Sequence, residues 1–367
     1  QGSAALLFKR TTPNLAMQVA VDEGGNGLAS PADTVGAHLL SDKCVAPSLS
    51  VRRLLSAMQQ RLAQNREELL TFSELPEFLQ IASAEDSGKI GHLREQAVTV
   101  LHQYFRRRWP LSGADWTSEE RCRGKDRPTG NRTLAGHVDV SACGVPYINA
   151  ALIPGLYPST ISYIATQHPL PATVGDFWRM VLCVQPAAIV MLNAAALEDV
   201  DDLPAYWRSA EHAGLRISNE EETCAEDVVV RALRCSGHDL EWRGPQLAVS
   251  WWADQSEPPL QRFLALMRLL DRVLQERRPA TVLVHCAGGI GRAGVFIAAD
   301  CGARAAALGG DVTACSPDRL MGHLRQRRMN MVQTGAQYDF LHRVLPLLTM
   351  QLQTSSSGEC VPSPTGN

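Results

Sequence analysis

Val282-Leu-Val-His-Cys286-Ala-Gly-Gly-Ile-Gly-Arg292-Ala-Gly-Val-Phe296 joins two apolar segments through a glycine-rich turn. The run from Thr281 to Val284 has the length and composition of a buried strand. The second apolar segment, from Val295 to Ala299, has the composition of a helix that begins where the turn ends. The stretch therefore predicts a strand, a tight turn and a helix in that order.

The turn carries residues that suit an anion. Glycines allow backbone N–H groups to converge on one point, and a helix N-terminus adds a positive field there. Arg292 offers a planar fork of donors to two phosphate oxygens. Cys286 lies in the same positive field, which favours the nucleophilic thiolate. We therefore expect a phosphate-binding turn built from Ala287, Gly288, Gly289, Ile290 and Gly291.

Two other interpretations fit the turn less well. A Walker-type loop needs Gly-Lys followed by Ser or Thr, and the turn has neither. A structural cysteine in an ordinary strand–turn–helix is the simpler alternative, but a cysteine and an arginine separated by five residues on a glycine-rich turn form a specific pattern. The pattern favours chemistry on a phosphate group.

Composition limits the classes of function. The chain has 367 residues, 45% of them hydrophobic, and a formal net charge of −3, so we expect a substantial core and no general nucleic-acid binding. Its ten cysteines include no Cys-x2-Cys pair, so neither a zinc ribbon nor a redox pair is expected, and a soluble, reducing compartment is favoured. We expect no transmembrane segment, metal or cofactor.

The pattern along the chain predicts four parts. Residues 1–47 have weak periodicity and are expected to form a flexible leader. Residues 48–112 are expected to form a small helical N-terminal extension, residues 113–350 the catalytic domain, and residues 351–367 a flexible tail. Within the domain, short strands are expected at Leu215–Ile217 and Val228–Leu233.

Three further segments extend the pattern around Cys286. These are Tyr147-Ile-Asn-Ala-Ala-Leu-Ile153, the segment from Tyr163 to Val181, and Ala188-Ile-Val-Met-Leu-Asn193. With the His-Cys-x5-Arg turn, they resemble the cysteine-dependent protein tyrosine phosphatase family over about residues 120 to 350. The resemblance implies an α/β fold, a twisted mixed sheet flanked by helices, with Cys286 at the carboxyl end of a central parallel strand.

The resemblance also implies roles for other residues. Asp254, in Trp252-Ala253-Asp254, matches the general acid of a mobile loop, and Glu257 is the second candidate. Gln333 matches the glutamine that positions water, and Gln337 is the alternative. His285 is expected to support the turn and the thiolate. The catalytic candidates are therefore Cys286, Arg292, Asp254, Gln333, Gln337 and His285.

Two alanines depart from the family pattern. Ala293 stands where the family usually has Ser or Thr, and Ala253 stands where it has proline. Both replaced residues assist turnover, so a catalytically weak phosphate-binding pseudophosphatase is an alternative of another class. The expected enzyme is a phosphoric monoester hydrolase that acts through a cysteinyl-phosphate intermediate.

The expected substrate class depends mainly on Thr133 and its surroundings. It stands where the family has a tyrosine that stacks on phosphotyrosine, and the chain around it is basic. An inositol polyphosphate, as in a phytase, is therefore slightly favoured over a phosphotyrosine protein. The chain also resembles phosphatases that bacterial pathogens inject by type III secretion, which implies a virulence effector in the host cytoplasm. The candidate substrate-binding bases are Arg123, Lys125, Arg127 and Arg132, with Arg121 beside them.

Overall fold

The computed structural model describes residues 138, 140–145, 147–193, 203–275, 277 and 279–357, together with a few residues between 55 and 103. All of them belong to one compact unit, Val51–Asn367. The described residues between 55 and 103 are helical. The expected leader, most of the expected helical extension and the basic segment around Thr133 lie outside the described residues, so the domain division stays a prediction.

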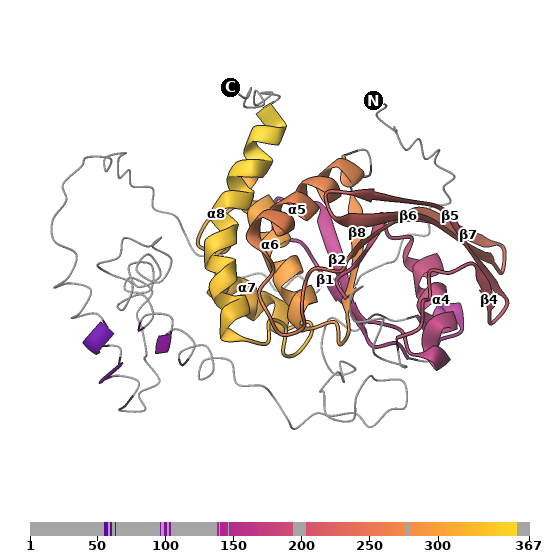
Figure 1. Cartoon of the computed structure of the whole chain (residues 1–367), viewed down its shortest axis with the longest axis horizontal. Helices are drawn as coiled ribbons and strands as arrows, with labels where there is room; N and C mark the ends of the chain where they lie inside the picture. The colour runs from indigo at the N-terminus through magenta and orange to yellow at the C-terminus, as the bar shows by residue number, and fades with distance from the viewer. Residues whose placement is uncertain are drawn as a thin grey trace, which may run out of the picture. The chain divides into compact units, whose positions relative to one another are not determined.

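The described strands form one eight-stranded sheet in the order β1-β2-β8-β3-β7-β6-β5-β4 (Figure 1). The four adjacent strands β2, β8, β3 and β7 run parallel to one another, and the remaining pairs, β1–β2, β7–β6, β6–β5 and β5–β4, are antiparallel. The sheet is therefore mixed, with β8 near its centre. The strands are β1 (Ala150–Ile153), β2 (Ile161–Gln167), β3 (Ala188–Met191), β4 (Ala210–His212), β5 (Leu215–Ala225), β6 (Val228–Gly237), β7 (Leu240–Val249) and β8 (Ala280–Cys286).

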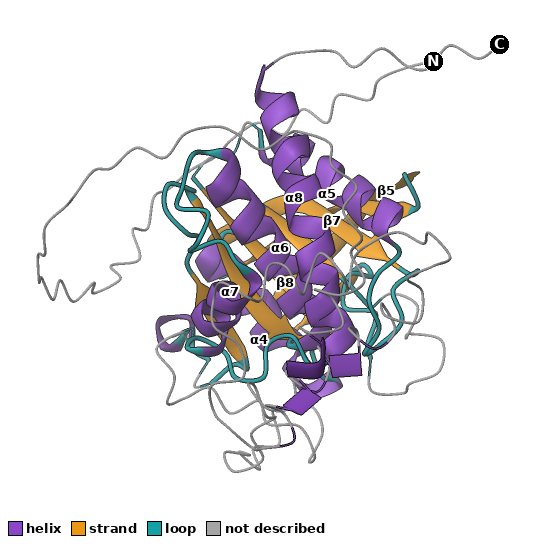
Figure 2. Ribbon diagram, turned by 90° about the vertical axis from the view of Figure 1, so that its left-hand side faces the viewer, coloured by secondary structure: helices purple, strands orange, loops and turns teal. Residues whose placement is uncertain are grey.

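Helices cover both faces of this sheet (Figures 1 and 2). One face carries α5, α6, α7 and α8, where α6 packs against β8, α7 and α8. The other face carries α4, which lies against β6 and β7. The helical segments are η1 (Ser141–Cys143), η2 (Pro171–Thr173), α4 (Val174–Val184), α5 (Leu260–Leu274), α6 (Gly291–Ala307), α7 (Pro317–Arg325) and α8 (Gly335–Ser357).

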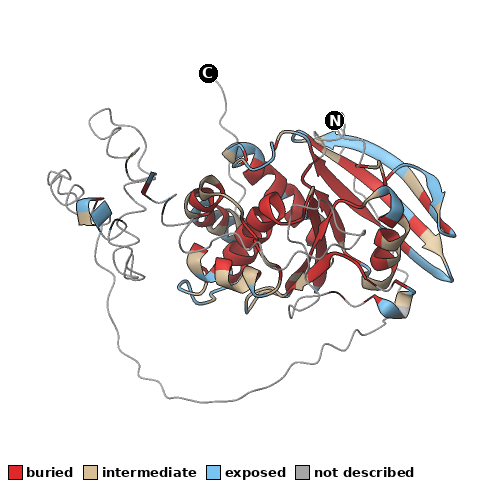
Figure 3. Cartoon of the chain, turned by 90° about the horizontal axis from the view of Figure 1, so that it is seen from below, coloured by how far each residue is buried: buried red, intermediate tan, exposed pale blue. Residues whose placement is uncertain are grey.

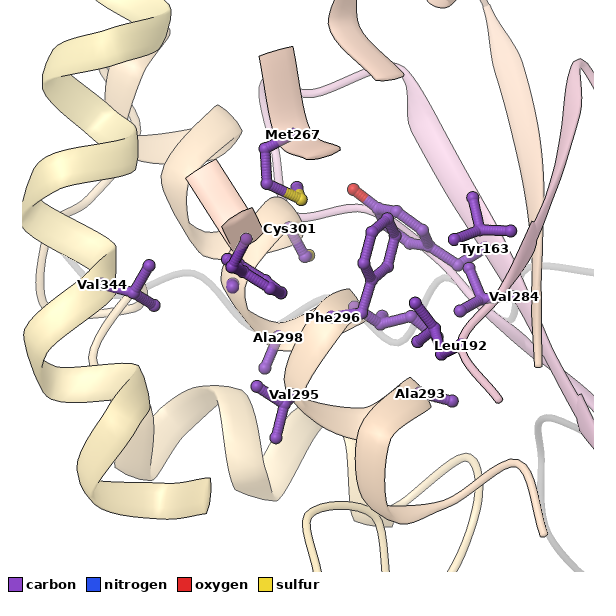
Figure 4. Packing of buried hydrophobic residues seen from close by; sticks show 14 of the residues in the cluster. Tyr163, Leu192, Met267, Val284, Ala293, Val295, Phe296, Ala298, Cys301 and Val344 are labelled. Carbon is purple, nitrogen blue, oxygen red and sulfur yellow. The ribbon is translucent and has the colours of Figure 1, made fainter. Parts of the chain in front are cut away.

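Successive side chains of the central strands point to opposite faces of the sheet, so the core consists of two clusters, one on each face. Val282 and Val284 of β8 pack into the larger cluster beneath α5, α6 and α8, whereas Leu283 packs into the cluster beneath α4. Figure 4 shows part of the larger cluster, with Phe296 of α6 beside Tyr163 of β2. Burial is densest at these central strands, and residues of β5 are mostly exposed (Figure 3). The expected α/β fold, a mixed sheet flanked by helices, is confirmed.

Two details differ from expectation. The model joins Cys143 of η1 to Cys183 of α4 in a disulfide, although the cysteine spacing indicated no pair. The two residues are 40 positions apart, and only the packing of η1 on α4 brings them together. Helix α8 continues to Ser357, seven residues into the expected flexible tail. Leu352 packs against the core, and the hydroxyls of Thr354 and Ser355 donate to the carbonyl of Gln351, which extends the helix.

Candidate active site

The nucleophile candidate lies at the carboxyl end of β8. Cys286 is the last residue of the strand, pairs in register with Gln167 of β2 and is 2% exposed. Helix α6 begins five residues later, at Gly291. The turn between them packs tightly on β2, because a Cβ at Gly289 would collide with the carbonyl oxygen of Thr166. Gly289 also has a φ of 68°, which favours glycine.

A buried arginine fixes the orientation of this turn. Arg328 is fully buried and donates from Nε to the carbonyl of Gly289 at 2.8 Å and from Nη2 to that of Gly288 at 3.0 Å. Its Nη1 donates to Oδ1 of Asn149 at 3.0 Å. Because N–H and C=O point in opposite directions across a trans peptide, the amides that follow these two carbonyls, those of Gly289 and Ile290, point away from Arg328. This is the geometry of an anion-binding turn.

Arg328 could not be identified from the sequence. It stands in a run of basic residues, five positions before Gln333. The structure ends α7 at Arg325 and turns the chain, which places the guanidinium of Arg328 under the phosphate-binding turn. An arginine just before the Gln-Thr segment is the feature that could have pointed to it.

Arg292 has donors available for a ligand. Its side chain is 2% exposed, and its Nη1 donates to the carbonyl of Trp252 at 2.9 Å. Among the described residues, Nε and Nη2 are buried and have no hydrogen-bond partner, although Nη2 lies 3.1 Å from Oδ1 of Asp254. A buried donor without an acceptor costs about 1–3 kcal/mol. A bound phosphate would remove that cost, because two adjacent guanidinium donors match two phosphate oxygens.

The expected general acid lies on the segment Trp252–Pro258, hereafter the acid loop. Trp252 is buried, stands edge-on to Phe263 of α5 and donates from its indole to the carbonyl of Ser256 at 2.9 Å. Asp254 pairs with Arg292, whereas the carboxylate of Glu257 pairs with Arg343 of α8. The structure therefore brings Asp254, and not Glu257, to the phosphate-binding turn.

The two glutamines lie at the other side of the turn. A Cβ at Gly291 would lie 2.5 Å from Oε1 of Gln333, so this side chain covers the start of α6. Gln337 is fully buried, accepts from the backbone N–H of Gln333 at 2.8 Å and donates to the carbonyl of Ser256 at 3.4 Å. Gln337 therefore links the acid loop to the segment of Gln333, and Gln333 is better placed to orient a water molecule.

A chain of hydrogen bonds links Arg231 of β6 to His285 of β8. Nη1 of Arg231 donates to Oε1 of Gln246 at 2.8 Å, which fixes the orientation of that amide because arginine only donates. Nε2 of Gln246 then donates to the hydroxyl of Tyr206 at 2.7 Å. The hydroxyl lies 2.6 Å from Nε2 of His285, within hydrogen-bond distance. The network therefore fixes the position of the His285 ring.

Burial raises the pKa of Tyr206 well above its ordinary value, so its hydroxyl stays protonated beside His285. Sequence reasoning missed Tyr206, Gln246 and Arg231, because strand register alone brings β6 and β7 beside β3 and β8. The expected substrate-binding bases Arg121, Arg123, Lys125, Arg127 and Arg132 lie outside the described residues.

Comparison with known proteins places the chain in a family. The model of the protein-tyrosine phosphatase family matches residues 120–346, which is more than half of the chain. The chain belongs to the protein-tyrosine phosphatase family. Its class is that of the cysteine-based phosphoric monoester hydrolases. The expected relationship to this family is confirmed.

Individual relatives agree with this placement. The chain is 29% identical over 357 residues to human phosphatidylinositol phosphatase PTPRQ, covering 89% of this chain and 14% of the relative. It is 34% identical over 219 residues to human tyrosine-protein phosphatase non-receptor type 7, covering 58% of this chain and 59% of the relative. The chain thus spans about one seventh of the first relative and less than two thirds of the second.

A solved structure shares the fold. A structure of PTPN18, described as the basis of its fingerprint on distinct HER2 tyrosine phosphorylation sites, superposes with a TM-score of 0.55 at 24% identity. The superposition covers 69% of this chain and 92% of that chain. In the part of the chain that the model describes, each helix is too short or too polar to span a bilayer.

Proposed function

We propose that this chain hydrolyses phosphotyrosine through a cysteinyl-phosphate intermediate. The observation that carries the proposal is the arrangement around Cys286. Two amides of the turn point away from Arg328, two buried donors of Arg292 have no hydrogen-bond acceptor in the described part of the chain, and Asp254 lies 3.1 Å from that arginine. An anion acceptor, a nucleophile and a proton donor therefore converge at the end of β8.

The first chemical step uses the thiolate of Cys286. Its sulfur attacks phosphorus, while the turn amides and the free donors of Arg292 bind the equatorial oxygens. The bond from phosphorus to the tyrosine oxygen breaks, and protonated Asp254 gives its proton to that oxygen. Tyrosine leaves as the neutral phenol, and Cys286 carries the phosphoryl group.

The second step releases phosphate. The amide of Gln333 orients a water molecule toward phosphorus, and the ionised Asp254 takes the proton from this water. The sulfur–phosphorus bond breaks, inorganic phosphate forms and the thiolate returns. His285, held by Tyr206, keeps the turn and the thiolate in place.

Family membership and the tyrosine-protein phosphatases among the relatives support phosphotyrosine as substrate. Inositol phosphates are the second candidate, because one relative is a phosphatidylinositol phosphatase and Thr133 replaces the expected stacking tyrosine. The relatives named above are human, and they give no support to the expected phytase effector exported by a bacterial pathogen.

The test is phosphate release from a phosphotyrosine peptide and from myo-inositol hexakisphosphate in parallel, with Cys286→Ser as the control for chemistry at the thiolate. We expect release from the peptide and none from the variant. Release from the inositol compound alone would move the substrate to the second candidate. Tight binding of phosphate ligands without any release would instead favour the pseudophosphatase that Ala293 and Ala253 suggest.

A further inference from the structure

The acid loop is attached at its C-terminal end to helix α8 by an ion pair. The carboxylate of Glu257 pairs with Nη2 of Arg343. The other contacts between this end of the loop and the α8 region are longer. The hydroxyl of Thr334 donates to the carbonyl of Gln255 at 3.3 Å, and Gln337 donates to that of Ser256 at 3.4 Å. The ion pair is the charge-assisted contact among them, and charge-assisted bonds are the stronger kind.

Arg343 is also held by contacts within α8 that do not involve the acid loop. Nε of Arg343 lies 3.1 Å from Oδ2 of Asp339, one helical turn earlier, and the guanidinium lies over the ring of Phe340 at 5.6 Å. Asp339 has a side chain that is 12% exposed and Arg343 one that is 24% exposed, whereas Glu257 is 44% exposed. Glu257 is therefore the partner that can leave, and Arg343 is the fixed side.

Chemistry at Arg292 removes one of the two contacts between this arginine and the loop, and the remaining contact, from Nη1 to the carbonyl of Trp252, lies at the N-terminal end of the loop. In the present structure Asp254 holds the loop to Arg292 through their ion pair. When phosphate occupies the donors of Arg292 and Asp254 carries the proton that it must deliver, that ion pair no longer exists. Ala253 adds to this effect, because alanine leaves the loop backbone freer than the family's proline. The contact between Glu257 and Arg343 involves neither reacting group and persists through this step.

We propose that Arg343 is a positioning residue that keeps the acid loop closed over bound phosphate through its ion pair with Glu257. This proposal rests on the proposed function, since it concerns the delivery of a proton by Asp254. Arg343 touches neither substrate nor reacting atoms, and it acts through the loop that carries Asp254.

The test compares Glu257→Gln, Arg343→Met and the double variant. Because a displaced general acid matters most when the leaving group is a poor one, the readout is kcat with phenyl phosphate and with p-nitrophenyl phosphate. We expect each single variant to lower kcat for phenyl phosphate by about two- to five-fold, the size of a partly exposed ion pair, and to affect p-nitrophenyl phosphate less. The double variant should lose no more than either single one.

The control is Arg234→Gln, which breaks a more exposed ion pair with Glu241 on the β6–β7 hairpin, away from the acid loop. We expect it to leave kcat unchanged for both substrates. Equal losses for the two leaving groups, or losses that add in the double variant, would overturn the proposal, because they indicate damage unrelated to the acid.

Hydrogen exchange gives a readout that does not depend on turnover. Amides of residues 252–258 should exchange faster in Glu257→Gln and Arg343→Met than in the parent or in Arg234→Gln. If the parent releases no phosphate, the proposed function fails while exchange still tests the anchor. If exchange in the loop is unchanged by both variants, the anchor is wrong even in an active enzyme.

Discussion

Ala293 is the residue where this site departs furthest from the chemistry that its family implies. It is fully buried near the start of α6 (Figure 4), and it belongs to the same apolar cluster as Cys286. No hydroxyl at this position can donate to the sulfur as it leaves phosphorus. The departure should therefore slow the second step more than the first, and cysteinyl-phosphate should accumulate during turnover.

Ala293→Ser should raise kcat by about two- to ten-fold, the effect of one hydrogen bond of about 0.5–1.5 kcal/mol to the leaving thiolate. The measurement is kcat together with the fraction of enzyme trapped as cysteinyl-phosphate by acid quenching, which should fall. The control is Ala298→Ser, which adds the same hydroxyl more than one turn farther along α6. An equal rise in both variants, or an unchanged trapped fraction in Ala293→Ser, would contradict the explanation.

The local sequence predicted the functional residues that lie on the turn itself. It did not predict the residues that support the turn from distant parts of the chain. Cys286 and Arg292 lie on one short segment whose pattern carries its own meaning, and the structure brings Asp254 and Gln333 to them. Arg328 and Tyr206 could not be predicted in this way. Their partners are 39 and 79 positions away, and only the packed sheet makes them neighbours.

At the scale of the elements, a buried polar network fixes the helices that flank the site. Arg304 of α6 donates from Nε to Asp300 at 2.8 Å and from Nη1 to Asp271 of α5 at 2.9 Å. The hydroxyl of Tyr163 of β2 donates to the other oxygen of Asp300 at 2.9 Å. Helix α6 begins at the phosphate-binding turn and α5 follows the acid loop. The network therefore sets the position of both loops relative to the sheet.

Arg304→Leu should destabilise the fold by about 3–5 kcal/mol, because it leaves two buried carboxylates without their cation. The measurement is the free energy of unfolding in urea. Arg268→Leu is the matched control, since Arg268 also lies on a helix of this face but makes an exposed pair with Glu226. The control should lose about 1 kcal/mol or less. Similar losses in the two variants would show that the network contributes no more than a surface pair.

A helix or strand could be predicted where a single pattern of hydrophobic residues ran through its whole length. The apolar run before Cys286 predicted β8. The antiparallel strands β5 and β6 are eleven and ten residues long, yet only the apolar pieces Leu215–Ile217 and Val228–Leu233 were expected. Glutamates and arginines occupy their exposed positions and pair across strands, as Arg243 does with Glu220, so composition made these strands resemble loops.

For the whole molecule, composition alone could not reveal how distant side chains pair. The disulfide between Cys143 and Cys183 is one example, since its two cysteines lie 40 positions apart. His342 of α8 is another. Its ring packs edge-on against Tyr338 at 4.7 Å between centroids, and its Nε2 is buried without a hydrogen-bond partner in the described part of the chain. A protonated imidazole has no favourable place there.

This histidine makes stability depend on pH. Burial lowers the pKa of His342 to about 3, whereas the imidazole of an unfolded chain titrates near about 6.5. Below that value the unfolded chain binds a proton that the folded protein excludes, so unfolding becomes more favourable as the pH falls. The contribution is complete above about pH 6.5 and is lost progressively toward pH 3. Between pH 7.5 and pH 5 the loss should be about 2 kcal/mol.

His342→Phe keeps a ring against Tyr338 and removes the titrating group. Urea unfolding at pH 7.5 and at pH 5 should show that this variant loses about 2 kcal/mol less than the parent over the interval. His212→Phe, at a half-exposed position on β4, serves as the control and should keep the parent's dependence on pH. If His342→Phe and the parent lose the same stability between the two pH values, the imidazole is able to take up its proton inside the folded protein. Helix α8 must then open locally around His342 without unfolding of the sheet.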